Sequence, residues 1–148
     1  MQISDLIQPA NVHADLAASS KLQVLQMLTK KASAALGLSE GFVLEPILTR
    51  EKLGSTGIAI PHTRLAGLGK PFGMLARLKR PIDFEAIDEV PVDMVFLLLV
   101  PDQGSNDHLN ALACVARRLR SPDVLARMRA APDAAQLHAA LVSDGGGA

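Results

Sequence analysis

Hydrophobic residues recur at helical spacing in the first third of the chain. Steps of three and four residues separate Leu22, Leu25, Leu28, Ala32 and Leu36, so they share one helical face. Ser20, with Gln23 three residues later, matches a capping box, and Gly37 is a typical helix end. The pattern predicts a helix from about residue 21 to residue 36.

A second, shorter hydrophobic face follows the first. Ser39 can cap a helix whose apolar positions are Phe42, Val43, Ile47 and Leu48. Pro46 lies inside this segment. A proline in a helix interior lacks the N–H donor and clashes with the preceding turn. We therefore expect a kink here, or two short helical pieces.

The middle of the chain changes to strand-like runs. The segment 58–60 is short and β-branched, 74–78 is mostly apolar and 92–100 is nearly all apolar, with turn residues between them. The continuous run from Met94 to Leu99 is typical of a central strand that is covered on both faces.

The last third returns to helical spacing. Ser105, Asn106 and Asp107 supply cap residues. The apolar positions that follow are Leu109, Leu112, Ala113, Ala116 and Leu119. Further helices are predicted from about 122 to 129 and from about 133 to 142. Helices on either side of three or four strands indicate an α/β or α+β sandwich.

Composition narrows the class of protein. The chain has 148 residues, 15 basic and 15 acidic side chains, no Trp and no Tyr. A nucleic-acid binder needs a basic face, or aromatic rings on which bases stack, so we expect no nucleic-acid partner. Cys114 is the only cysteine, which excludes an intramolecular disulfide.

The chain shows no signal for a membrane or for a second domain. The first residues lack a signal-peptide pattern, and the longest apolar run, Val95 to Val100, is too short to cross a bilayer. We expect a cytoplasmic protein without stable membrane insertion. One domain is predicted over residues 1–144, followed by a flexible glycine-rich tail at 145–148.

Four histidines are candidates for chemistry, and their contexts separate them. His13 lies in a polar segment and His138 on the last predicted helix, so both are interpreted as surface histidines. His62 follows the strand-like segment 58–60, where we expect the chain to turn out of the sheet. Ligand sites of α/β sheets collect at this edge. Pro61 restricts its own backbone and biases Ile60 towards an extended conformation, so it would hold the ring on a stiff support.

Two other residues could complete a phosphate site with His62. His108 falls near the start of the helix after the central strand, and helix N-termini favour anions. Arg50 could grip two phosphate oxygens with its guanidinium. A solvent-exposed role is the alternative for each, and spacing does not establish that the three side chains converge.

Several stretches together resemble the mannitol/fructose class (type 2) of enzyme IIA proteins from the bacterial phosphoenolpyruvate-dependent phosphotransferase system. The resemblance lies in 48–57 (Leu-Thr-Arg-Glu-Lys-Leu-Gly-Ser-Thr-Gly), 58–62 (Ile-Ala-Ile-Pro-His), 81–88, 100–101 and 108–113. It covers nearly the whole chain and is greatest for the nitrogen-regulatory branch.

The resemblance implies a three-layer α/β sandwich, with a mixed sheet of roughly five strands and helices on both faces. It implies that His62 accepts a phosphoryl group on Nε2 from an HPr-like carrier, that His108 donates a hydrogen bond to that group, and that Arg50 helps to neutralise it. We expect no cofactor and no metal. Members of the nitrogen branch act chiefly as regulators through their phosphorylation state.

One departure from the resemblance leaves alternatives open. Related sequences usually carry a few more residues between the Gly-Ser-Thr-Gly turn and the Ile-Pro-His strand, whereas here Gly57 runs directly into Ile58. The alternatives are a sugar-specific enzyme IIA that passes phosphate to a membrane permease, and a regulator that binds partners without transferring phosphate. A metal site on His62 and His108 lacks an obvious third ligand.

Overall fold

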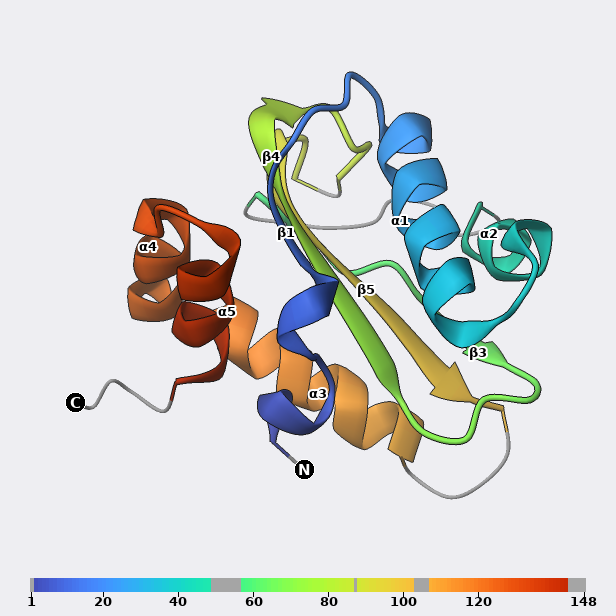
Figure 1. Cartoon of the computed structure of the whole chain (residues 1–148). Coiled ribbons are helices and arrows are strands. Elements are labelled where there is room, and N and C mark those ends of the chain that lie inside the picture. The colour runs from blue at the N-terminus through green and yellow to red at the C-terminus, as the bar shows by residue number, and fades with distance from the viewer. Residues whose placement is uncertain (1, 49–56, 87, 103–106, 144–148) are drawn as a thin grey trace.

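A five-stranded mixed sheet forms the centre of the molecule in the computed structural model (Figure 1), which describes residues 2–48, 57–86, 88–102 and 107–143. The strands are β1 (Val12–Leu16), β2 (Ile58–Ala59), β3 (His62–Leu65), β4 (Phe72–Ile82) and β5 (Val92–Pro101). Their order is β1-β4-β5-β2, and β3 also pairs with β5. The β4–β5 pair is antiparallel and the other pairs are parallel.

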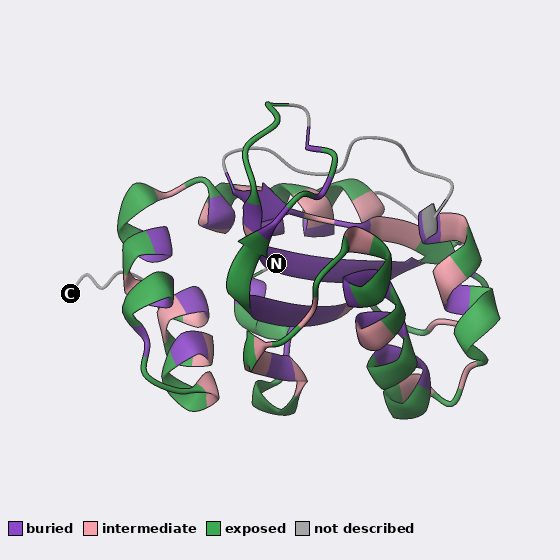
Figure 2. Ribbon diagram, turned by 90° about the horizontal axis from the view of Figure 1, so that it is seen from above, coloured by how far each residue is buried: buried purple, intermediate pink, exposed green. Residues whose placement is uncertain are grey.

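Helices cover both faces of this sheet. The helices are α1 (Lys21–Leu36), α2 (Glu40–Leu48), α3 (Asp107–Leu119), α4 (Pro122–Ala130) and α5 (Ala134–Val142), and short 3₁₀ turns span Ile3–Asp5 and Pro9–Asn11. The side chains of β5 alternate between two cores. Met94, Phe96, Leu98 and Val100 pack in the core that includes α3, α4 and α5, whereas Val95, Leu97 and Leu99 pack in the core that includes α1 and α2. Figure 2 shows this buried layer between the two sets of helices. The predicted three-layer α/β sandwich is confirmed.

The end signals of α1 are also confirmed. The Ser20 hydroxyl accepts a hydrogen bond from the Gln23 N–H at 3.1 Å, and Gly37 ends the helix with φ of 70°. The Gln23 side chain accepts from the Ser19 N–H, one residue earlier than a capping box requires. Leu22 was expected on the buried face but is 49% exposed, because it precedes the first position that reaches the sheet, Val24.

Pro46 does not divide the second helix. The α2 helix runs without interruption from Glu40 to Leu48, with Pro46 inside its last turn, so the prediction of two separate pieces is wrong. Pro46 removes one backbone N–H donor, and the helix ends two residues after it. Ser39 caps the helix as predicted, since its hydroxyl accepts from the Phe42 N–H at 3.3 Å. Phe42 itself is 44% exposed, although it was expected on the apolar face.

The buried face of α3 also differs from the predicted one. Ala111, Cys114, Val115 and Leu119 are buried, whereas Leu109 is 62% exposed and Ala113 is exposed. The predicted face is therefore rotated about the helix axis from the observed one. The two following helices begin and end as predicted, within one residue.

The first strand was missed in the sequence, and His13 belongs to it. His13 pairs with Ala76 of β4 and is only partly exposed, so it is not a surface histidine. Burial lowers its pKa from 6.5, and the positive charge of Lys31 lowers it further. His138 is also partly buried, and its Nε2 lies 3.3 Å from the Ile7 carbonyl oxygen.

Candidate functional site

His62 is the first residue of β3, on an edge of the sheet. Ile58 of β2 pairs with Met94, and four residues further on His62 pairs with Leu98, so β2 and β3 follow β5 in one register. Pro61 interrupts the pairing because it has no N–H to donate. The chain therefore stays on the edge of the sheet at His62, where the sequence suggested that it turns out of the sheet.

The orientation of the His62 ring is set by a backbone carbonyl. Nδ1 lies 2.6 Å from the carbonyl oxygen of Ile60. A carbonyl oxygen only accepts hydrogen bonds, so Nδ1 carries the ring proton and the lone pair of the neutral ring is on Nε2. The carbonyl of the next residue, Pro61, accepts from the Leu98 N–H at 2.9 Å. Because successive carbonyls of a strand point to opposite sides, that of Ile60 points away from β5.

His108 lies beside His62 in space. It is the second residue of α3, and the centroids of the two imidazole rings are 6.3 Å apart with an interplanar angle of 44°. The first turn of α3 has backbone N–H groups without partners in the helix, and the positive end of the helix dipole lies there. Two imidazoles and the start of a helix therefore meet at the end of β5, an arrangement suited to a phosphate-sized anion.

The third predicted residue, Arg50, lies outside the described residues, as do Gly54, Ser55 and Thr56 of the predicted turn. The predicted cap residues Ser105 and Asn106 and the predicted tail at 145–148 are likewise outside them.

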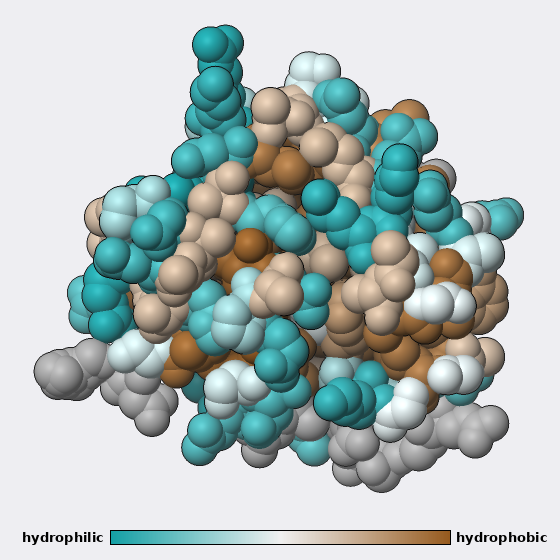
Figure 3. Space-filling model, in the orientation of Figure 1, coloured by the Kyte–Doolittle hydropathy of each residue, from teal (hydrophilic) through white to brown (hydrophobic). Residues whose placement is uncertain are grey.

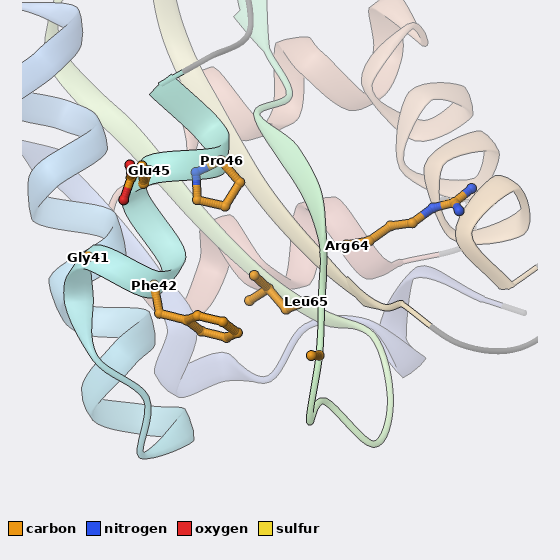
Figure 4. A pocket seen from close by; sticks show the side chains of 7 residues that line it. Gly41, Phe42, Glu45, Pro46, Arg64 and Leu65 are labelled. Atoms are coloured by element: carbon orange, nitrogen blue, oxygen red, sulfur yellow. The ribbon is translucent and has the colours of Figure 1, made fainter.

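Figure 4 shows a shallow hollow on the α2 side of β3. It has a volume of about 290 Å³, and its lining includes Phe42, Pro46 and Leu65. Arg64 borders this hollow, but its side chain points away from Phe42 and Leu65. Arg64 was not among the residues predicted from the sequence. Its position two residues after His62 was the available signal, since residues two apart on a strand share a face.

A second hollow, of about 490 Å³, lies between the end of α1 and the β3–β4 connection. Its lining includes Leu36, Leu68, Pro71 and Phe72. In Figure 3, hydrophobic side chains gather towards the lower right of the face shown, below the C-terminal end of α1. The lining of this second hollow contains no imidazole or carboxylate, so we assign no chemistry to it.

The other end of β5 is held by charged groups. Asp93 accepts hydrogen bonds from Nε and Nη2 of Arg129 at 2.9 and 3.0 Å, and its N–H donates to the Gly57 carbonyl at 3.0 Å. Gly57 has φ of 84°, and a Cβ there would lie 3.0 Å from Arg129 Nη2. The chain thus enters β2 at a position that glycine suits, against a fixed ion pair.

Neither a metal cluster nor a membrane span is found in the described part of the chain. Within it, no three His, Cys, Asp or Glu side chains gather in a way that could hold a metal ion. None of its helices has the length and apolar character needed to cross a bilayer.

Known proteins resemble this chain over most of its length. The profile of the family described as "Phosphoenolpyruvate-dependent sugar phosphotransferase system, EIIA 2" matches residues 5–143. A nitrogen regulatory protein of Bradyrhizobium diazoefficiens is 48% identical over 145 residues, which are 95% of each chain. A fructose-specific EIIA component of Haloferax volcanii is 39% identical over 85 residues, 55% of each chain.

The fold has a close counterpart among solved structures. The crystal structure of nitrogen regulatory protein IIA-Ntr from Neisseria meningitidis superposes with a TM-score of 0.84 and 24% sequence identity, and the match covers 94% of this chain and 98% of that one. Profile, sequence and fold agree, and this chain belongs to the EIIA type-2 family of the phosphoenolpyruvate-dependent sugar phosphotransferase system.

Proposed function

We propose that this chain is a phosphocarrier of the nitrogen-regulatory phosphotransferase system, and that His62 accepts the phosphoryl group on Nε2. The observation that carries the proposal is the contact between His62 Nδ1 and the Ile60 carbonyl, 2.6 Å apart. It leaves Nε2 as the nucleophilic nitrogen before any donor arrives, with the ring already oriented.

The transfer itself needs only one bond to form and one to break. The Nε2 lone pair attacks phosphorus in line, and the bond between phosphorus and the donor breaks with its electron pair remaining on the donor. The Nδ1 proton stays on the ring, hydrogen-bonded to Ile60. Once the phosphoryl group is attached, its two negative charges need hydrogen-bond donors.

His108 is the proposed donor to the phosphoryl oxygens. Its ring centroid lies 6.3 Å from that of His62, so a phosphoryl group on His62 would be carried next to the His108 imidazole. The start of α3 adds the positive end of a helix dipole. Arg50 completes the proposed site on the strength of the family resemblance alone.

The proposed phosphate donor is an HPr-like carrier protein. Such a carrier must present its phosphoryl group to the edge of the sheet at His62. Exposed hydrophobic side chains belong to the two helices near this edge, since Leu109 on α3 is 62% exposed and Phe42 on α2 is 44% exposed. Apolar surface next to a reactive group is typical of a protein-binding site.

The similarities to known proteins favour a regulatory function over a sugar-specific one. The match to the nitrogen regulatory protein covers 95% of this chain, whereas the match to the fructose-specific component covers 55%. The oriented His62 ring favours a protein that transfers phosphate over one that only binds partners.

The test is phosphorylation of this protein by the purified upstream proteins of the phosphotransferase system. Incubation with phosphoenolpyruvate, an enzyme I homologue and an HPr-like carrier should add one acid-labile phosphoryl group, measured by intact mass. His62→Ala should lower the rate at least about 1000-fold, because it removes the attacking nitrogen. His138→Gln, on the remote helix α5, serves as the matched control. An unmodified wild type would overturn the proposal, and modification of His62→Ala would overturn the choice of acceptor.

A further inference from the structure

The strand that carries His62 presents a second polar side chain on the same face. Along this edge of the sheet, Ile58 and Ile60 pack with the core beside α3, whereas Ala59 and Leu65 pack with the core beside α1 and α2. Side chains of a strand alternate between faces. His62 and Arg64 therefore share the α3 face, which agrees with the contact between His62 and His108.

Arg64 is exposed, and its side chain extends away from Phe42 and Leu65 in Figure 4. Its guanidinium makes no hydrogen bond or ion pair with any residue that the structure describes. Three other arginines are used differently. The guanidinium groups of Arg77, Arg118 and Arg129 are hydrogen-bonded to backbone carbonyls or to carboxylates. Arg64 thus has no structural bond to break when it binds an anion.

We propose that Arg64 binds the phosphoryl group carried by His62, as a cationic donor supplied by the same strand. This inference rests on the proposed function of His62. Residues two apart on a strand are separated by about 6.6 Å, a distance that the long arginine side chain covers by folding back along the strand. His108 approaches the phosphoryl group from α3, and Arg64 approaches it from the open edge.

The chemistry of the side chain suits this position. A guanidinium presents parallel N–H groups that grip two phosphoryl oxygens, and it keeps its charge at every physiological pH. Arg64 takes no proton and forms no bond to phosphorus. It stabilises the phosphorylated product through charge and hydrogen bonds. The alternative is an exposed arginine that contacts only solvent or the donor protein.

The experiment compares Arg64→Gln, Arg64→Lys and the control Arg80→Gln with wild type. Arg80 is exposed and lies on β4 seven residues beyond Gly73, which pairs with Leu98 opposite His62, so it is about 23 Å along the strand from the site. The first measurement is the equilibrium constant for phosphoryl transfer from the phosphorylated HPr-like carrier. The second is the pKa of the bound phosphoryl group, followed by ³¹P NMR on each phosphorylated protein.

Arg64→Gln should shift the equilibrium roughly tenfold towards the donor. It should also raise the pKa of the phosphoryl group, because a nearby cation favours the dianion. Arg64→Lys should restore part of the equilibrium constant and part of the lowered phosphoryl pKa, since it keeps the positive charge but lacks the two parallel N–H groups of the guanidinium. Arg80→Gln should match wild type in both measurements.

Each contrary result has a definite meaning. An equilibrium constant and phosphoryl pKa unchanged in Arg64→Gln would overturn the inference while leaving His62 as acceptor. Slower transfer with an unchanged equilibrium would assign Arg64 to donor docking, which also overturns it. Failure of wild type to accept phosphate would instead reject the proposed function, and this inference with it.

Discussion

The two ends of β5 use arginine in opposite ways. At the start of the strand, Arg129 holds Asp93 through two hydrogen bonds, beside the Gly57 carbonyl. At the far end, near Leu98, the Arg64 guanidinium bonds to no described residue. Arg129 lies against Gly57, where the chain enters β2, whereas Arg64 belongs to β3, the next strand to pair with β5. The first position serves stability and the second leaves a cation available for a ligand.

Arg77 lies near the start of β5, the end at which arginine serves stability. It pairs with Met94 in the sheet and is only 8% exposed. Its guanidinium donates to the carbonyls of Met128 and Ala131 at 3.0 and 2.6 Å, at the end of α4. A buried charge is tolerated when its donors are satisfied in this way. The contrast separates substitutions that should unfold the protein from those that should only disable it.

The largest effect on stability is expected from Arg77→Met. The substitution removes the donors to two carbonyls, one of them 2.6 Å away, and leaves these acceptors with fewer partners in a buried setting. We expect a loss of about 3 kcal/mol in the free energy of unfolding, measured by urea denaturation. Lys79→Met, at an exposed position of the same strand, is the control. A loss equal to that of the control would show that Arg77 does not hold α4 to the sheet.

A smaller effect is expected from Arg129→Gln, and none from Arg64→Gln. The Arg129 and Asp93 side chains are 42% and 23% exposed, so solvent screens their attraction. We expect Arg129→Gln to cost about 1 kcal/mol and Arg64→Gln less than about 0.5 kcal/mol. Urea denaturation at low and high salt would measure both. If Arg64→Gln were the more destabilising variant, the contrast between the two ends would be wrong.

The smallest effect concerns His13 on β1, which pairs with Ala76 of β4. Its pKa in the folded state is lowered, mainly by burial and further by Lys31. Below pH 6.5 the unfolded chain takes up a proton that the folded protein resists. Stability should therefore fall as the pH drops from 6.5 towards the lowered value. Urea midpoints at pH 7.5 and 5.5 should differ less in His13→Gln, and an equal difference in both proteins would remove His13 as the cause.

Long periodic segments could be predicted from the sequence because the spacing of their apolar residues indicates the type of element. The apolar run of β5 and the capped face of α1 were found in this way. The β1 strand was missed because its five residues, Val12–Leu16, include His13 and Asp15, which suggest a loop. The buried face of α3 was misjudged because apolar residues lie on more than one side of this helix, and the side that meets the sheet is decided by tertiary packing.

The residues of the site divide in the same way, into those indicated by local sequence and those that depend on tertiary packing. His62 was distinguished by Pro61 and the strand before it, but the approach of His108 depends on how α3 returns to the sheet after β5. That return is not encoded in local spacing. Arg64 was passed over because a lone arginine after a histidine has no distinctive pattern until the strand alternation is known. The role of Arg50 stays a prediction, since it lies outside the described residues.

The bond from His62 to the Ile60 carbonyl has a consequence for signalling. An outward carbonyl on an edge strand is normally free to accept a hydrogen bond from a strand of another chain. Here the His62 imidazole donates to that carbonyl instead. The bond uses Nδ1 only, so it survives when Nε2 is modified. We therefore expect the backbone and the ring to be superposable in the two states. A partner that distinguishes these states would then read the added charge rather than a change of shape.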